Sequence, residues 1–313
     1  MTLKTRLTRR AALAGAAALP LAASLPQPLK AAAHGGAAEM PIARTFSLGD
    51  LTVTAFLDAS NMRENPKELF AKSAPDAEFA ALSAENFVPT DRTQFYFTPS
   101  LVDTGSELVL FDTGLGQGGI QKALAAAGVT PDAIDVVVIT HMHPDHIGGL
   151  MTKEGTPTFA NARYVTGAVE YNFWSGLEAG NPVGDMVAKL VTPLAEKMTF
   201  IDDGAAVVPG VTSIASFGHT PGHMSFLLDS AGQNLVLTAD LANHYVWSFA
   251  RPDWPMSFDS DPETAGASRR RVLGMLAADK VPMIGYHMPF PAAGYVESRD
   301  DGFRYVPVSY QLG

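Results

Sequence analysis

The sequence contains no cysteine. That absence excludes disulfide bonds, a thiolate nucleophile, iron–sulfur ligation and cysteine-type zinc sites, so any bound metal must be held by histidines and carboxylates. The eight histidines are therefore the first candidates for chemistry. Charged residues make up only 17% of the 313 residues and hydrophobic ones 47%, a composition that excludes disorder, collagen and a coiled coil.

Positive charge is also scarce beyond the N-terminus. The first 33 residues hold five of the 22 Lys and Arg and no acidic residue, so 17 basic residues stand against 32 acidic ones in the remainder, a net charge of −15. Such a surface repels phosphate backbones and anionic lipids. We therefore expect a small-molecule partner, with no nucleic acid and no membrane surface.

The N-terminal segment lacks an apolar run long enough to span a bilayer. Thr8-Arg9-Arg10 precedes an apolar stretch of about 15 residues, against the ~20 that a spanning helix needs, and Ala31-Ala32-Ala33 follows. This pattern predicts an export signal over residues 1–33 rather than a membrane anchor, and a periplasmic or secreted mature protein. The arginine pair resembles a twin-arginine signal, with the general secretory route left open.

No linker or internal repeat divides residues 34–313, which we interpret as one domain. Alternating residues predict a hairpin over 46–57, and the polar segment 61–91 is expected to form an irregular surface excursion with a short helix near 77–83. Further strands are expected within 94–102, over 108–111 and 136–139, in short segments that end at Val165 and pass through Ile214, and over 235–237, 281–285 and 303–308. Helices are expected at 120–127, 168–174, 183–197 and 268–278. Strands grouped in meanders with helices between them predict stacked sheets with helices outside.

Four ligand-type residues follow the buried strand Val136–Ile139. In extended chain His141 and His143 project to the same side, and the turn at Pro144 brings Asp145 and His146 to a second position nearby. Burying these groups without a cation would be costly. The segment therefore predicts two adjacent coordination spheres.

This segment resembles the His-x-His-x-Asp-His signature of the metallo-beta-lactamase-fold hydrolases, and the resemblance extends over roughly residues 45–313. It implies an α+β fold, a four-layer αββα sandwich with the site at one edge of the two sheets. Later motifs supply the remaining ligands: His219 would join His141 and His143, Asp240 would bridge, and His287 would join Asp145 and His146. His223, in the same motif as His219, is expected to pack locally.

The resemblance implies two divalent metal ions, with Zn²⁺ the best match to the ligands and Mn²⁺, Co²⁺ and Fe²⁺ left open. Asp145 and Asp240 are the candidate catalytic carboxylates. A hydroxide shared by the metals would attack the substrate, so the expected reaction is hydrolysis.

Several residues are expected around the metals. Trp174, Phe95, Phe97 and Met288 are candidates for an apolar substrate pocket. Ordinary core packing explains Trp174 equally well and is the favoured explanation for the other three. Asn243 stands where lactonases of this superfamily commonly have a tyrosine that donates to the lactone oxygen, and an amide can also donate. Asp112 is expected to orient a ligand histidine.

The sequence thus predicts an exported dinuclear metal-dependent hydrolase that cleaves a phosphotriester or a lactone of apolar character. It resembles the phosphotriesterases of the methyl parathion hydrolase type more than the quorum-quenching lactonases. Acyl-homoserine-lactone hydrolysis as the main activity is the first alternative. A non-catalytic exported metal-binding protein is the second. The oligomeric state, a homodimer included, is left open.

Overall fold

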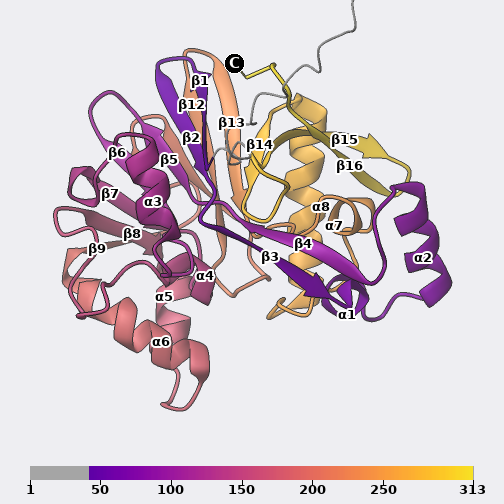
Figure 1. Ribbon diagram of the computed structural model, residues 1–313, viewed down its shortest axis with the longest axis horizontal. Coiled ribbons are helices and arrows are strands. Elements are labelled where there is room, and N and C mark those ends of the chain that lie inside the picture. The colour runs from indigo at the N-terminus through magenta and orange to yellow at the C-terminus, as the bar shows by residue number, and fades with distance from the viewer. Residues whose placement is uncertain (1–41, 313) are drawn as a thin grey trace, which may run out of the picture. The chain divides into compact units, whose positions relative to one another are not determined.

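The computed structural model describes residues 42–312 (Figure 1). The expected export signal, residues 1–33, lies outside this range and stays a prediction. Among the described residues, no helix combines the length and the hydrophobicity needed to cross a bilayer.

Two seven-stranded sheets form the centre of the described domain. The first sheet begins with the predicted hairpin, runs antiparallel as far as its fourth strand and continues parallel from there to its last. Its strands, in spatial order, are β1 (Ala43–Leu48), β2 (Leu51–Phe56), β5 (Ser100–Asp103), β6 (Leu108–Phe111), β7 (Val136–Ile139), β8 (Arg163–Gly167) and β9 (Met198–Ile201).

The second sheet is antiparallel except where β13 pairs parallel with β14. Its strands lie side by side in chain order: β10 (Ala206–Val208), β11 (Val211–Ala215), β12 (Met224–Ser230), β13 (Gln233–Ala239), β14 (Met283–Gly285), β15 (Ala293–Arg299) and β16 (Gly302–Pro307). Both β7 in the first sheet and β13 in the second end at the metal-ligand segments, so the sheets deliver these segments to a common edge.

Helices cover the outer faces of the two sheets (Figure 1). The first sheet carries α3 (Gly119–Ala126), α4 (Pro144–Ile147), α5 (Ala168–Ser175) and α6 (Pro182–Leu190), and the second carries α7 (Trp247–Ala250) and α8 (Pro262–Asp279). Between the sheets, apolar side chains such as Val53, Val138 and Phe226 form one buried cluster, and a second cluster lies beneath the helices of the first sheet. The predicted four-layer arrangement is confirmed.

The segment 61–91 differs in part from the prediction. The helix expected near 77–83 is present as α2 (Asp76–Glu85), preceded by the short α1 (Pro66–Phe70), but the irregular excursion begins with a strand, β3 (Ala59–Glu64), paired to β4 (Arg92–Phe97). Nearly all of β3 is exposed. Because no face of β3 enters the core, its sequence lacks the apolar alternation that reveals a half-buried strand.

Two helices have bounds other than those predicted. The helix expected over 183–197 is interrupted: α6 ends at Leu190 and a 3₁₀ turn follows over Thr192–Lys197, because Pro193 has no N–H to continue the helix. Conversely, α8 starts six residues before the predicted Ser268, since Asp261 caps it by accepting from the Thr264 amide.

Candidate metal centre

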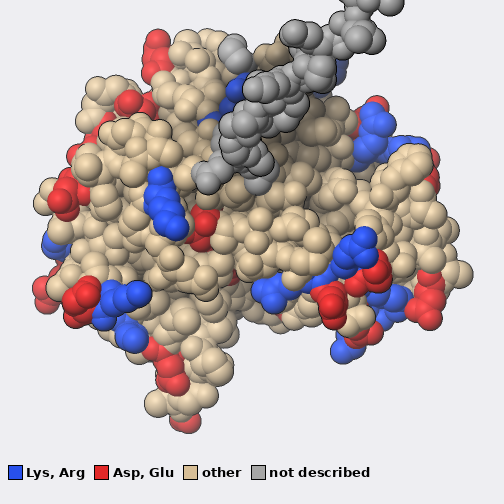
Figure 2. All heavy atoms as spheres, viewed as in Figure 1, with Lys and Arg blue, Asp and Glu red and all other residues tan. Residues whose placement is uncertain are grey.

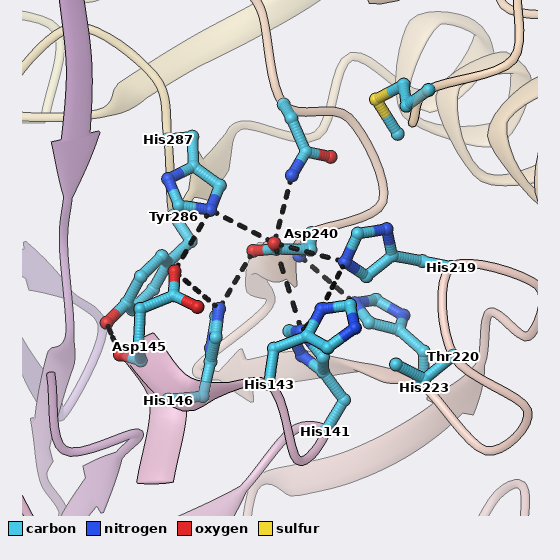
Figure 3. Close-up of polar contacts among 12 residues, drawn as sticks. His141, His143, Asp145, His146, His219, Thr220, His223, Asp240, Tyr286 and His287 are labelled. Atoms are coloured by element: carbon cyan, nitrogen blue, oxygen red, sulfur yellow. Dashed lines mark hydrogen bonds and ion pairs between the residues drawn. The ribbon is translucent and has the colours of Figure 1, made fainter. Parts of the chain in front are cut away.

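The first predicted ligand group comes together at the edge of the sheets (Figure 3). His141 and His143 lie in the loop after β7, and His219 lies in the loop between β11 and β12. The His143 Nδ1 atom is 3.1 Å from His141 Nε2 and 3.0 Å from His219 Nε2. With an Asp240 oxygen, these three nitrogens lie within 4.8 Å of one another, which is the spacing of ligands around a single ion.

The second group forms beside the first. His146 follows Pro144 on the single turn of α4, and His287 follows β14. His287 Nε2 lies 3.0 Å from Asp240 Oδ2 and 3.4 Å from Asp145 Oδ2, and His146 Nε2 lies 3.2 Å from Asp240 Oδ1. Asp240 thus belongs to both groups and directs one oxygen to each of two neighbouring histidines.

Two of these atoms require a partner that the chain does not provide. His146 Nε2 and Asp240 Oδ1 are buried and make no hydrogen bond within the described residues, although they are only 3.2 Å apart. Unpaired polar atoms in the interior are costly, and a cation between them would satisfy both. The residues therefore fit a divalent metal, and the mixture of imidazole and carboxylate suits zinc.

The carboxylates of the cluster remain ionised. Burial by itself would raise the pKa of Asp240, but the adjacent His287 and His146 hold this pKa well below its usual value. The pKa of Asp145 is likewise lowered: burial opposes ionisation, and His146 and His287 outweigh it. Both carboxylates are therefore available as anionic ligands for a cation.

Side chains and carbonyls behind the ligands fix their orientation. Asp112 Oδ2 lies 2.8 Å from His146 Nδ1, and its Oδ1 accepts from the Thr140 amide at 2.9 Å, so Asp112 lies where the sequence placed it. His287 Nδ1 donates to the Tyr96 carbonyl at 2.6 Å. Each contact leaves Nε2 of the histidine directed at the centre.

His223 packs locally, as expected. Its Nδ1 contacts the Ser216 hydroxyl at 2.9 Å, and its Nε2 accepts from the Asp240 backbone amide at 3.0 Å. His223 thereby supports the shared ligand from behind without joining either group.

Glu170 on α5 is a structural support that the sequence analysis missed. Its fully buried carboxylate accepts from the Met142 amide at 2.8 Å and the Trp174 indole at 2.7 Å through Oε1, and from the Thr220 hydroxyl at 2.7 Å and the Gly222 amide at 2.8 Å through Oε2. It therefore ties the loop of His141 and His143 to the loop of His219. A single glutamate on a helix gives no sequence signal for such a role.

The centre opens onto a cavity of about 290 Å³. Phe95, one of the predicted pocket residues, lines it and packs on His287 with 4.1 Å between ring centroids. Asn243 also lines it and donates from Nδ2 to Asp240 Oδ2 at 2.9 Å. Phe97, another of the candidate pocket residues, lines it too, and residues that the sequence did not predict complete the wall: Arg63, Leu69, Leu115 and Phe258.

Two other predicted pocket residues lie elsewhere. Met288 is fully buried in the cluster between the sheets, because the chain turns inward after His287, so its assignment to the pocket is corrected. Trp174 is not among the lining residues of the cavity. It lies behind His143, with 6.2 Å between ring centroids, and its indole is bound to Glu170.

Comparisons with known proteins agree with this geometry. Residues 98–284 match the family model described as the metallo-beta-lactamase superfamily. An N-acyl homoserine lactonase from Bacillus sp. is 27% identical over 198 residues, which cover 58% of this chain and 73% of the relative. A thioesterase, pkgB, of Emericella nidulans is 27% identical over 209 residues, 64% of this chain and 49% of that protein.

Solved structures show the same fold. AidC, described as a dizinc quorum-quenching lactonase in complex with a product, superposes with a TM-score of 0.78 at 27% identity and covers 87% of this chain and 100% of its own. The hydrolase AbOPH, described as belonging to the beta lactamase superfamily, also has a TM-score of 0.78, at 24% identity, with 87% of this chain and 99% of its own covered.

Proposed function

The chain belongs to the metallo-beta-lactamase superfamily and is a metal-dependent hydrolase of ester bonds, and from its site we propose that it is a dinuclear zinc enzyme that opens small lactones with apolar side chains. The sharing of Asp240 between two ligand groups is the observation that carries the proposal. A carboxylate in that position would be able to hold two divalent ions side by side, where both could act on one substrate.

Divalent ions, when bound, supply Lewis acidity that lowers the pKa of water and polarises the ester oxygen. The chain supplies the positioning. Asp240 and Asp145 keep the charge of the centre balanced, and Asp112 holds His146 in place. Phe95 and Phe97 flank His287 and shield one side of the site from water.

Openness of the centre argues against a purely structural role for the metals. The Asp145 side chain is 18% exposed and lines the cavity, whereas structural zinc sites are closed by protein on all sides. A non-catalytic metal-binding protein is therefore the weaker alternative. Two bound ions without hydrolysis of any ester would favour it.

Lactones are supported as substrates by the cavity and by the relatives. Leu69, Leu115 and Phe258 offer an apolar wall for an acyl chain beside the metal ligands. On the face shown in Figure 2, basic side chains are interspersed with acidic ones. Several of the similar proteins are N-acyl homoserine lactonases, which supports a lactone with an apolar amide chain.

Phosphotriesters are the second candidate because of Asn243. Its amide already donates to Asp240 and takes the place of the tyrosine common in the lactonases, so no phenol is aimed at a lactone oxygen from this position. A phosphotriester needs no such donor, since both transition states place negative charge on an oxygen at the metals.

A direct comparison tests both candidates. The zinc-loaded protein is assayed with N-hexanoyl-homoserine lactone and with a p-nitrophenyl phosphotriester, and a chelator-treated sample of the same preparation is the control. We expect a higher kcat/KM for the lactone and loss of both activities in the control. No hydrolysis of either compound by protein that holds its metals would refute the substrate assignment.

We also propose that the enzyme is exported, on the basis of the pattern in residues 1–33. Fractionation of cells expressing the full chain should recover a shortened protein outside the cytoplasm. Replacing Arg9 and Arg10 with lysine should retain it inside if the twin-arginine route is used. Full-length protein confined to the cytoplasm in both cases would contradict export.

A further inference from the structure

A loop over residues 251–261, between α7 and α8, contacts the metal centre through Asp259. The Asp259 carboxylate is completely buried, and its Oδ1 lies 3.1 Å from His219 Nδ1. Its Oδ2 accepts from both terminal nitrogens of Arg269, each at 3.1 Å, and from the Met256 amide at 3.1 Å. Histidine, aspartate and arginine thus form a buried chain of contacts ending at a metal-ligand residue.

Arg269 ties this loop to α8. Its side chain is only 1% exposed, and besides Asp259 it donates from Nε to the Pro252 carbonyl at 2.6 Å and from Nη2 to the Trp254 carbonyl at 3.4 Å. Because a buried guanidinium requires a paired carboxylate, Asp259 cannot move away without leaving a charge unpaired. The position of Asp259 is therefore set by the body of the domain.

The same loop builds part of the cavity wall. Phe258, adjacent to Asp259, lines the cavity and is 38% exposed, with its ring centroid 6.2 Å from that of Phe95. The amide of Ser260 donates to the His219 carbonyl at 2.9 Å. One anchor thus holds both a metal ligand and an aromatic wall of the substrate cavity.

The two ligand groups have separate supports. In the first group, His219 Nδ1 contacts the carboxylate of Asp259, which lies outside the ligand cluster. His141 Nδ1 contacts the Thr140 hydroxyl instead. In the second group, the corresponding carboxylate is Asp112, behind His146. Loss of Asp259 should therefore affect one metal position and spare the other.

We infer that the Arg269–Asp259 pair is a positioning element that directs His219 Nε2 toward the first metal position and fixes Phe258 at the cavity wall. Asp259 acts by accepting a hydrogen bond from His219 Nδ1–H, which leaves the Nε2 lone pair free for the ion. The inference rests on the two-metal occupancy of the proposed function.

Asp259→Asn tests it by metal binding rather than by turnover. Stepwise zinc titration of the metal-free variant against a competing chelator should show one ion weakened by about 10–100-fold and the other unchanged within about threefold. Zinc-edge anomalous scattering from crystals at limiting metal should show the lower occupancy at the position of His141, His143 and His219.

Asp253→Asn is the matched control. Asp253 lies in the same loop as Asp259 and pairs with Arg270, which lies on α8 beside Arg269. This pair is exposed and makes no hydrogen bond to His219. This variant should keep both affinities. Phe258→Ala should keep both affinities as well, and should raise KM for an apolar lactone without an equal change in kcat, whereas Asp259→Asn should change both the metal affinity and KM.

Unchanged affinity for both ions in Asp259→Asn would overturn the inference, and so would equal weakening of both ions. If the asparagine variant does not fold, Asp259→Glu, which keeps the charge beside Arg269 but displaces the carboxylate, decides by the same titration. Because the titration needs no substrate, a protein that hydrolyses no ester can still show the selective loss. A wild-type protein that binds a single ion would instead count against the dinuclear proposal.

Discussion

Replacing Glu170 with glutamine should destabilise the protein far more than the change of one atom suggests. The carboxylate accepts four hydrogen bonds in a fully buried position, two on each oxygen. In glutamine one oxygen becomes an NH₂ group, which can only donate. With the NH₂ group on the Oε1 side, the Met142 amide and the Trp174 indole would both face another donor; on the Oε2 side the Gly222 amide would, while the Thr220 hydroxyl can turn and accept.

The expected magnitude follows from these contacts. A hydrogen bond to a charged group contributes about 1.5–3 kcal/mol, so the orientation that loses only the bond of the Gly222 amide lowers the free energy of unfolding by about 1.5–3 kcal/mol. Burial raises the pKa of Glu170, although its four donors oppose the rise, so part of this stabilisation is already offset in the native protein by desolvation. We therefore expect a value inside this range, about 2 kcal/mol.

Urea unfolding of the metal-free protein, followed by circular dichroism, measures this effect without the contribution of bound metal. Glu78→Gln is the matched control, since Glu78 pairs with Arg251 at a partly exposed position and should cost less than about 1 kcal/mol. If Glu170→Gln unfolds within about 1 kcal/mol of the wild type, Glu170 does not hold the two ligand loops together.

Three further predictions concern the centre and its surroundings. Asp240→Ala removes the ligand shared by both groups. In a lactone assay kcat/KM should fall by more than the roughly 10–100-fold loss typical of replacing a residue that only supports a ligand. Zinc analysis of the variant should show fewer than two ions, and retention of two would contradict the prediction. Trp174→Phe deletes one hydrogen bond to Glu170 and should cost about 1–3 kcal/mol in urea unfolding with KM unchanged, whereas a large change in KM would place Trp174 in the cavity after all. Burial lowers the pKa of His244 from 6.5 to about 3, so below pH 6.5 this histidine binds a proton in the unfolded chain but not in the folded one. The free energy of unfolding should therefore be highest above pH 6.5 and fall by about 2 kcal/mol by pH 5. His244→Gln should flatten this part of the pH profile of unfolding, and an unchanged slope would assign it to other groups.

The candidate ligands could be predicted because each of them stands in a short sequence motif that can be recognised without knowledge of the fold. Four of them lie within six residues after an apolar strand, and the other three stand in short motifs in the expected order. Most strands of the two sheets and most outer helices could also be predicted from the sequence, because half-buried strands and amphipathic helices each have a characteristic spacing of apolar residues.

What supports the ligands could not be predicted in the same way. Glu170 bonds to loops that lie 28 and 52 residues away in the sequence, and Asp259 contacts a histidine 40 residues away. The residues adjacent to Glu170 and Asp259 in the sequence give no indication of these distant partners. The strand β3 was missed because exposed strands show no burial pattern. Met288 was misplaced for a related reason, since an apolar residue next to a ligand can face the cavity or the core, and only the tertiary path of the chain decides.

The most direct test of the account is the metal content of the protein under conditions that remove loosely bound ions. Mass spectrometry of the intact holoprotein, together with zinc-edge anomalous scattering, should show two ions flanking Asp240, one beside His219 and the other beside His287. Purified, folded protein that binds no transition metal, with unfolding and hydrolysis both indifferent to chelators, would contradict the account.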